Sequence, residues 1–191
     1  ILGILFAIAA AFSIAQGALR GGLILVILAA LPDMLDGALA KAAGSASQRG
    51  AFFDSVVDRV TDSLLFGGVA WFFASEKSPH LALLPMAIMG VSSLISYERA
   101  KAEALGLYAK GGLMERAERI IVLCIGLLFD SLLVPILWIM LALTVITAIQ
   151  RFVQVWRQAE VSSTTQAKRD VRTVRRMSRQ SARASRRQLS V

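Results

Sequence analysis

Residues 21–43 read GGLILVILAALPDMLDGALAKAA, and residues 50–74 read GAFFDSVVDRVTDSLLFGGVAWFFA. Both stretches reach the roughly 20 mostly apolar residues that a helix needs to cross a bilayer core. Acidic residues interrupt both runs: Asp33 and Asp36 in the first, and Asp54 and Asp58, with Asp62 after them, in the second. Ionised side chains are costly inside a membrane, so they usually mark functional sites there. These residues predict two neighbouring membrane helices that share an acidic site.

The whole chain has the composition of a polytopic membrane protein. Its 191 residues are 56% hydrophobic and 18% charged, whereas soluble domains are roughly 45–50% apolar and about 25% charged. The fold class that we predict is an all-α integral membrane protein with six transmembrane helices. Apolar runs and the turn residues between them place these helices at Ile1–Ala15, Gly21–Ala43, Gly50–Ala74, His80–Ala100, Arg119–Phe129 and Leu132–Arg151, the last continuing to about Trp156.

The charge distribution predicts the orientation of these helices. If the ends after spans two, four and six face the cytoplasm, only Arg20 and Lys77 of the 21 Lys and Arg residues lie on the other side. The positive-inside rule therefore puts the four aspartates near the cytoplasmic face of the cell (plasma) membrane. Because the chain opens at Ile1 within an apolar run, we expect it to begin partway through a longer native sequence.

A basic segment follows the last predicted span. Residues 161–191 contain nine Lys and Arg residues, one acid and few large apolar residues. Such a composition cannot bury enough apolar surface to fold by itself. We therefore divide the chain into a transmembrane domain, residues 1–157, and a disordered basic cytoplasmic tail, residues 158–191. The tail is expected to lie near anionic lipid. No aromatic residues alternate with its arginines, so we predict no nucleic-acid partner.

The four aspartates have the spacing of a metal site. Asp33 and Asp36 are three residues apart, and Asp54 and Asp58 are four apart, so each pair lies on one helix face. Carboxylates held this close repel one another unless a cation compensates them. Hard oxygen ligands favour Mg²⁺, Mn²⁺ or Ca²⁺, and two such ions would suit phosphoryl chemistry. Buried ion pairs with arginines are the structural alternative.

Small residues accompany the acids and complete a motif. Gly37, Ala40 and Gly50 would let a helix or a bulky ligand approach the backbone closely. The full pattern is D-x-x-D-G-x-x-A-K-x(8)-G-x-x-x-D-x-x-x-D. It resembles the signature of the CDP-alcohol phosphotransferases at seven of eight fixed positions, with Lys41 where that family has arginine. The resemblance implies a six-span membrane enzyme, of EC 2.7.8 type, that transfers a substituted phosphate from a CDP-linked donor to an alcohol and releases CMP.

The resemblance also implies residue roles. Asp58 would be the general base, and the metal, expected to be two ions of Mg²⁺ or Mn²⁺, would be held by Asp33, Asp36, Asp54 and Asp58. The donor, CDP-diacylglycerol, would enter from the lipid bilayer and contact Asp33, Gly37, Ala40, Lys41 and Gly50. A homodimer is expected on the same ground. The amphipathic helix that precedes the first span in the family is missing from this chain.

A second group of residues indicates the acceptor. Arg99, Arg119 and Arg151 lie on three predicted helices, and with Ser96 they could converge beside the metal site. Arginine binds phosphate bidentately, so these residues predict a phosphorylated acceptor. The alternative is that they are flanking charges of cytoplasmic helix ends.

Three runs around these residues carry a second resemblance: SYERAKAEALGL at 96–107, GGLMERAER at 111–119 and Gln150-Arg151. They resemble the actinobacterial phosphatidylinositol-phosphate synthases, a subfamily in which Arg99 is usually lysine. The resemblance implies that inositol phosphate is the acceptor, bound by Ser96, Arg99, Arg119 and Arg151, and that phosphatidylinositol phosphate and CMP are the products.

Three other functions compete with this interpretation. A phosphatidylglycerol-phosphate synthase of the same family would also need a basic pocket for its acceptor. An intramembrane cation transporter would explain the buried acids, but it would need neither the glycine and alanine spacing nor arginines on one face. A non-enzymatic membrane anchor would tolerate replacement of all four aspartates.

Overall fold

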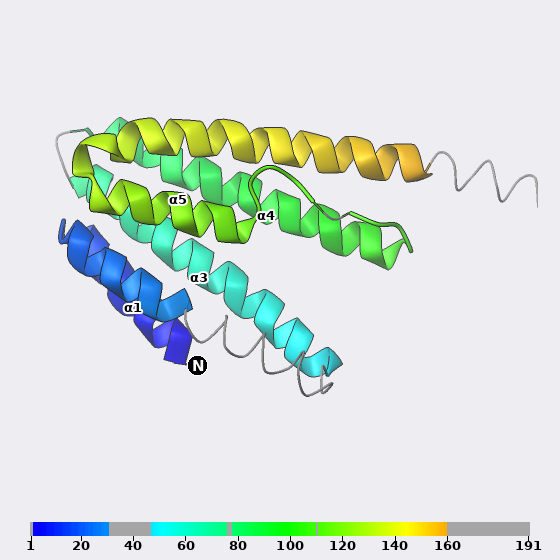
Figure 1. The fold of residues 1–191 in the computed structure, drawn as a ribbon, viewed down its shortest axis with the longest axis horizontal. Helices are drawn as coiled ribbons and strands as arrows, with labels where there is room; N and C mark the ends of the chain where they lie inside the picture. Colours follow the sequence, from blue (N-terminus) through cyan, green and yellow to red (C-terminus); the bar gives the residue numbers. More distant parts are fainter. Residues whose placement is uncertain (1, 31–46, 76–77, 110, 160–191) are drawn as a thin grey trace, which may run out of the picture.

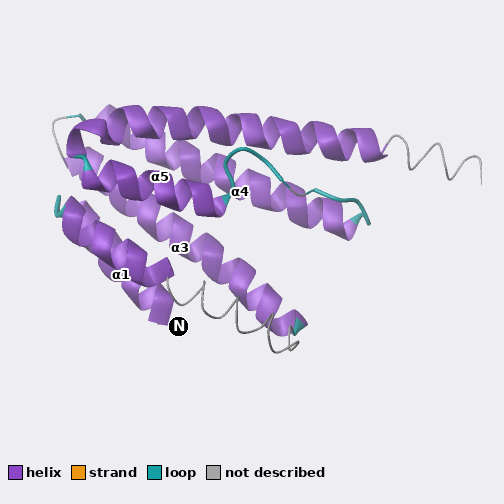
Figure 2. Cartoon of the chain, viewed as in Figure 1, coloured by secondary structure: helices purple, strands orange, loops and turns teal. Residues whose placement is uncertain are grey.

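The computed structural model describes residues 2–30, 47–75, 78–109 and 111–159, and every regular element within these ranges is helical (Figures 1 and 2). Helix α1, Leu2–Ala15, is followed by a helix over Leu19–Ala30. The longest labelled helix is α3, Gln48–Ser75; the 3₁₀ turn Pro79–Ala82 then leads into α4, Leu83–Ala104. Helix α5, Arg116–Leu128, and the 3₁₀ turn Asp130–Leu132 precede a final helix over residues 133–159.

Local sequence explains where two of these helices begin and end. The Ser47 hydroxyl accepts a hydrogen bond from the backbone N–H of Gly50 at 3.0 Å, which caps the start of α3. Helix α4 ends at Ala104, two residues before Gly106, whose φ of +70° is readily adopted by glycine. The backbone N–H of Leu107 reaches back to the Ala102 carbonyl at 2.8 Å, and that of Gly106 reaches Glu103 at 3.0 Å. This Schellman motif satisfies the last carbonyls of α4.

Helix α3 lies at the centre of the packing, in contact with both α1 and α4. All its buried residues belong to its second half: Thr61, Asp62, Leu65, Phe66, Gly68, Val69 and Phe73. Gly68 allows the closest approach, because a Cβ atom there would lie 2.6 Å from the Ala11 carbonyl oxygen of α1. The first half of α3, residues 48–60, contains no buried residue.

The described helices begin and end within a few residues of the predicted spans, except that the second span, predicted over Gly21–Ala43, lies outside the described residues from position 31 onward. The all-α prediction is confirmed for the described residues. Two helical segments, Pro79–Ala104 and Asp130–Ala159, are long and apolar enough to cross a membrane. Within the described ranges α1 and Leu19–Ala30 are shorter apolar helices. Helix α4 continues four residues beyond the predicted end at Ala100, because the Schellman motif at Gly106 ends it.

Candidate active site

The described aspartates of the motif lie on the exposed half of α3. Asp54 is exposed, and Asp58 is half-buried one turn later, where the burial of α3 begins. Gly50 is exposed one turn before Asp54. The predicted residues Asp33, Asp36, Gly37, Ala40 and Lys41 lie outside the described part of the chain. The structure therefore describes one of the two predicted pairs of acids.

The described residues fit part of a metal site. Asp54 and Asp58 offer two carboxylates on one face of α3, and carboxylate oxygen is the donor that hard divalent cations prefer. Among the described residues, no group of three or more His, Cys, Asp or Glu side chains could hold a metal ion. The other two predicted metal ligands, Asp33 and Asp36, lie outside the described residues, so the four-aspartate metal site stays a prediction.

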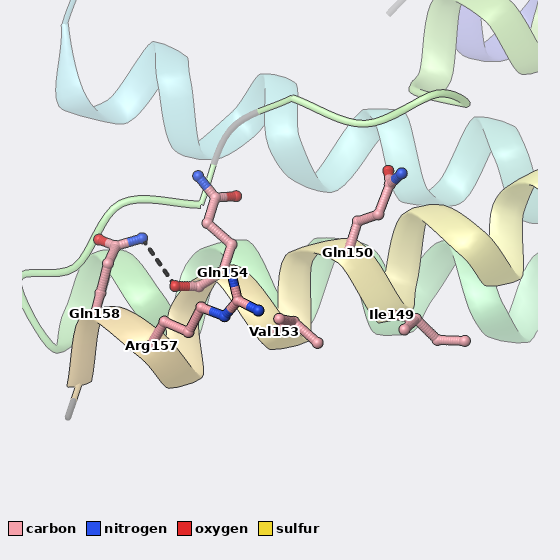
Figure 3. A pocket seen from close by; sticks show the side chains of 6 residues that line it. All are labelled: Ile149, Gln150, Val153, Gln154, Arg157 and Gln158. Carbon is pink, nitrogen blue, oxygen red and sulfur yellow. Dashed lines mark hydrogen bonds between the residues drawn. The ribbon is translucent and has the colours of Figure 1, made fainter.

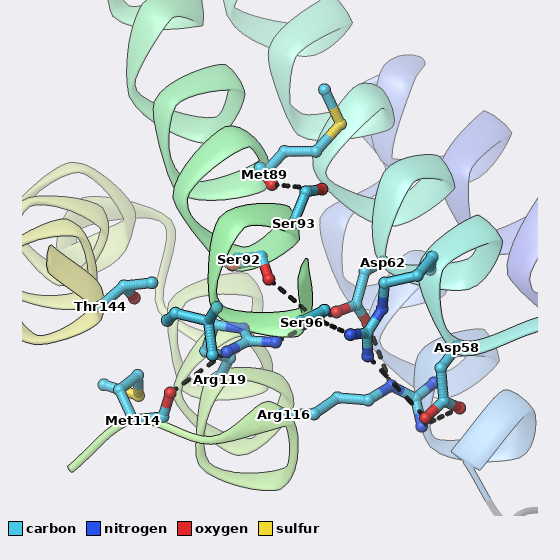
Figure 4. Close-up of polar contacts among 12 residues, drawn as sticks. Asp58, Asp62, Met89, Ser92, Ser93, Ser96, Met114, Arg116, Arg119 and Thr144 are labelled. Carbon is cyan, nitrogen blue, oxygen red and sulfur yellow. Dashed lines mark hydrogen bonds and ion pairs between the residues drawn. The ribbon is translucent and has the colours of Figure 1, made fainter. Parts of the chain in front are cut away.

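Arginines from α5 face the acids of α3 across the bundle (Figure 4). The guanidinium of Arg116 lies 2.7 Å from one Asp58 oxygen and 3.1 Å from one Asp62 oxygen. The other Asp62 oxygen lies 3.2 Å from a terminal nitrogen of Arg119. Asp62 and Arg119 are buried, with 4% and 2% of their surfaces exposed. The four side chains form one connected ionic cluster, which we call the α3–α5 ion cluster.

Helical periodicity explains why these four residues meet. Asp58 and Asp62 are four residues apart on α3, and Arg116 and Arg119 are three apart on α5, so each pair occupies one helix face. Arg116 and Arg119 lie in the first turn of α5, where the helix dipole disfavours positive charge by about 0.3–1 kcal/mol. The carboxylates of α3 offset that cost, and the two helices are thereby fixed in register.

Ser96 of α4 lies next to this cluster. Its hydroxyl accepts a hydrogen bond from Arg59 of α3 and donates one to the Ser92 carbonyl at 3.0 Å. A terminal nitrogen of Arg59 is 3.9 Å from Asp58. Three guanidinium groups, those of Arg59, Arg116 and Arg119, therefore accompany two carboxylates at the junction of α3, α4 and α5. The excess positive charge suits an anionic ligand.

The other two predicted acceptor ligands have partners in their own chain. Arg151 is 5% exposed, and its guanidinium donates to the carbonyls of Gly111 and Ile95 and to the carboxylate of Glu115. Arg99 is exposed and pairs with Glu103 at 3.0 Å along α4. Arg151 of the final helix thus contacts α4 at Ile95, the residue before Ser96, whereas the Arg99 side chain lies on the outer surface. The role of all four residues in binding an acceptor stays a prediction.

Sequence reasoning missed Arg59, Arg116 and Glu115, and it left Asp62 without a role. A signal for Arg116 was present. The segment Glu115–Arg119 places two arginines three residues apart at a helix start, and Asp58 and Asp62 form a matching acidic pair. No comparable signal connected Arg59 with Ser96, which is 37 positions away.

The loop between α4 and α5 is bound to the final helix. The Gln158 side chain accepts from the Tyr108 backbone N–H at 3.0 Å and donates to the Tyr108 carbonyl at 2.6 Å. Figure 3 shows Gln158 at the end of a shallow hollow along the final helix, lined by Ile149, Gln150, Val153, Gln154, Arg157 and Gln158. All these lining residues come from one helix. The hollow is open surface and lacks the convergent groups of an acceptor site.

An apolar groove begins at the ion cluster and runs between helices. Its inner part encloses about 400 Å³ and is bordered by Arg116 and Thr61, with apolar residues of Leu19–Ala30, α3 and α5 behind them. A second hollow continues along Leu19–Ala30 and α5 as far as Leu128. The two hollows share Ala30, Ile120 and Ile121. The groove therefore connects a polar end at Arg116 with an apolar outer surface, as an amphipathic ligand requires.

Comparisons with known proteins match this chain to one enzyme family. The family model for CDP-alcohol phosphatidyltransferase matches residues 1–156. The phosphatidylinositol phosphate synthase of Mycobacteroides abscessus is 39% identical over 142 residues, which cover 71% of this chain and 64% of that protein. That of Mycolicibacterium smegmatis is 36% identical over 144 residues, covering 71% of this chain and 65% of the relative. The chain thus spans just under two thirds of the length of these curated relatives.

Solved structures of the Mycobacterium tuberculosis phosphatidylinositol phosphate synthase have the same fold. The crystal structure with CDP-DAG bound superposes with a TM-score of 0.76 and 34% identity, covering 82% of this chain and 83% of that chain. The complex with manganese and citrate gives a TM-score of 0.75 and 32% identity, covering 82% and 81%.

Proposed function

Because the chain belongs to the CDP-alcohol phosphatidyltransferase family, we propose that it transfers the phosphatidyl group from CDP-diacylglycerol to inositol phosphate. The products are phosphatidylinositol phosphate and CMP. The observation that carries this proposal is the α3–α5 ion cluster at the mouth of an apolar groove. Together with the neighbouring Arg59, this cluster places three guanidinium groups beside the carboxylates of Asp58 and Asp62. A carboxylate base, cationic groups for phosphate and a lipid-accessible groove are what the reaction requires.

The donor site would combine the groove with the motif residues. The donor's acyl chains would occupy the groove between Leu19–Ala30 and α5, so that the lipid enters sideways from the bilayer. Its nucleotide and diphosphate would contact Asp33, Gly37, Ala40, Lys41 and Gly50. Two divalent ions, Mg²⁺ or Mn²⁺, would be held by Asp33, Asp36, Asp54 and Asp58. When bound, they would neutralise the negative charge of the diphosphate.

The acceptor site would lie where α3, α4 and α5 meet. Ser96, Arg99, Arg119 and Arg151 would bind the phosphate of the acceptor. Asp58, as general base, would take the proton from the attacking hydroxyl, whose oxygen then forms a bond to the β-phosphorus. The bond from that phosphorus to the CMP oxygen breaks, and CMP leaves. Positioned general bases contribute about 10²–10⁴-fold to such steps.

We also propose the arrangement in the cell. All six helices would cross the plasma membrane, with the active site facing the cytoplasm and residues 158–191 forming a basic cytoplasmic tail. Hydrogen bonds from Arg151 and Gln158 join the final helix to the α4–α5 loop, which supports a common side for these ends. The enzyme would act as a homodimer.

The test is CMP release from CDP-diacylglycerol by the purified full chain in detergent with Mg²⁺. Inositol 1-phosphate, glycerol 3-phosphate and free inositol are compared as acceptors, and Asp58→Asn serves as the inactive control. We expect CMP with inositol phosphate alone. Release with glycerol phosphate alone would keep the mechanism but make the protein a phosphatidylglycerol-phosphate synthase. No release with any acceptor would contradict the proposal and favour the transporter or the anchor.

A further inference from the structure

Asp62 joins the two halves of the proposed active site. We propose that it is a positioning residue that orients Arg119 toward the acceptor phosphate and, through Arg116, orients the base Asp58. This inference rests on the proposed function for the roles of Arg119 and Asp58. It adds a residue that lies outside the family signature and touches neither substrate in that scheme.

The contacts of Asp62 are divided between two arginines. One carboxylate oxygen is 3.1 Å from Nε of Arg116, and the other is 3.2 Å from a terminal nitrogen of Arg119. Arg116 also holds an Asp58 oxygen at 2.7 Å. The sequence of contacts therefore runs from Arg119 through Asp62 and Arg116 to Asp58. A shift of the Asp62 carboxylate would move the acceptor ligand and the base together.

Arg119 has the features of a prepositioned ligand. Its terminal nitrogens are fixed by Asp62 and by the Met114 carbonyl, the latter at 3.1 Å. Its Nε is buried and has no hydrogen-bond partner among the described residues. A buried donor without a partner is costly. It is well explained if an oxygen of a bound anion accepts from it.

Stability alone is a weak reason for such a buried carboxylate. A buried ion pair pays a desolvation cost that often cancels its Coulombic gain, and well-packed apolar residues can replace it without loss. The core around Leu65, Phe66 and Val69 already packs α3 by apolar contacts. Geometry is a better reason, since a misplacement of about 1 Å can cost about a hundredfold in rate.

Two substitutions separate positioning from folding. Asp62→Asn removes the charge at constant size, and Asp62→Glu keeps the charge but moves it outward by about one methylene group. Asp130→Asn is the matched control, because Asp130 is exposed in the 3₁₀ turn after α5. For each variant kcat, the KM for inositol phosphate, the KM for CDP-diacylglycerol and the thermal unfolding midpoint are measured in detergent.

We expect both Asp62 variants to raise the acceptor KM and to lower kcat, each by about tenfold or more, with the donor KM within about twofold of wild type. If Asp62→Asn does not fold, Asp62→Glu alone carries the test. Wild-type kinetics in Asp62→Glu would overturn the inference. So would equal changes in all three parameters that follow the unfolding midpoint, because that pattern indicates a purely structural residue.

A binding measurement separates this inference from the proposed function. Inorganic phosphate is titrated calorimetrically into wild type, Asp62→Glu and Asp130→Asn. One outcome is that the wild type is inactive but binds phosphate, and that the affinity is about tenfold lower in Asp62→Glu and unchanged in Asp130→Asn. This outcome would overturn the proposed function and leave the positioning of Arg119 intact. An active wild type with equal phosphate affinity in all three proteins would overturn the positioning alone.

Discussion

Both halves of α3 carry large apolar residues, but their surroundings differ. In residues 48–60 two phenylalanines and two of the three valines are exposed, whereas the buried residues of α3 lie within 61–75. Phe52 is 73% exposed and Phe66 is 1% exposed. Apolar composition therefore does not decide which half is buried; the neighbouring helices do. The exposed half carries the motif acids, while the buried half holds the helix in place, and Asp58 and Asp62 lie at the boundary.

The largest effect on activity is expected from replacing a motif aspartate in the exposed half of α3. Asp58→Asn should lower the rate of CMP release by about 10²–10⁴-fold, because an amide cannot accept the proton of the acceptor. Helical content should stay close to wild type and the unfolding midpoint should fall only slightly, since Arg116 keeps its ion pair with Asp62. A variant that keeps more than about a tenth of the wild-type rate would remove Asp58 from the role of base. Asp130→Asn, made in parallel, should be fully active.

A substitution in the buried half of α3 should lower the stability of the protein and not the rate of the chemical step. Phe66→Ala removes a fully buried ring and should lower the free energy of unfolding by about 3–5 kcal/mol. Phe52→Ala is the matched control, since the same change at an exposed site should cost less than about 0.5 kcal/mol. Unfolding in mixed micelles, followed by circular dichroism, measures both. Equal losses would mean that the first half of α3 is also packed.

Two adjacent glycines sharpen the comparison within the buried half. A Cβ at Gly68 would meet backbone atoms of Ala11 at 2.6 and 2.8 Å, whereas a Cβ at Gly67 would have nothing within 4 Å. Gly68→Ala should therefore push α1 from α3 and cost about 1–3 kcal/mol. Gly67→Ala should be neutral or stabilising by up to about 1 kcal/mol, the difference in helix propensity. The same micelle unfolding assay distinguishes them, and a harmless Gly68→Ala would contradict the close α1–α3 contact.

The smallest effect is expected at an exposed ion pair of α4. Glu103→Gln breaks the pair with Arg99, in which about half of each side chain is exposed, and should change stability by only about 0.3–0.5 kcal/mol. It also releases the Arg99 guanidinium. If Arg99 binds the acceptor phosphate, the acceptor KM should stay constant or fall slightly. A several-fold rise in that KM would show that Glu103 is needed to orient Arg99.

The sequence was sufficient for the helices, because each apolar run ends in local turn residues. The predicted end of α4 at Ala100 is four residues early, because the helix continues to Ala104 and stops just before the left-handed Gly106. Asp54 and Asp58 were placed on one face by spacing alone. Their arginine partners were not predicted, since Asp58 and Arg116 are 58 positions apart and pair only after the helices pack.

The predicted arginine pocket shows a related limit. Arg99, Arg119 and Arg151 were grouped because each is a cation near a cytoplasmic helix end. In the structure each arginine has a different carboxylate partner: Glu103 pairs with Arg99, Asp62 with Arg119 and Glu115 with Arg151. Net charge indicated the end of the bundle at which arginines gather. It did not indicate which of them are already occupied by carboxylates.

In the proposed membrane arrangement, the length of α3 would set the depth of the reaction. Its 28 residues rise about 42 Å, more than the hydrocarbon thickness of about 30 Å, but the part from Asp58 to Ser75 rises only about 26 Å. With that part in the hydrocarbon, Asp58 would lie at the hydrocarbon edge beneath the lipid head groups, and the first turns of α3 would extend toward the water. Hydrophobic mismatch then acts on the enzyme directly. A thicker bilayer would draw the acids toward the hydrocarbon, so lipid chain length itself would tune the rate.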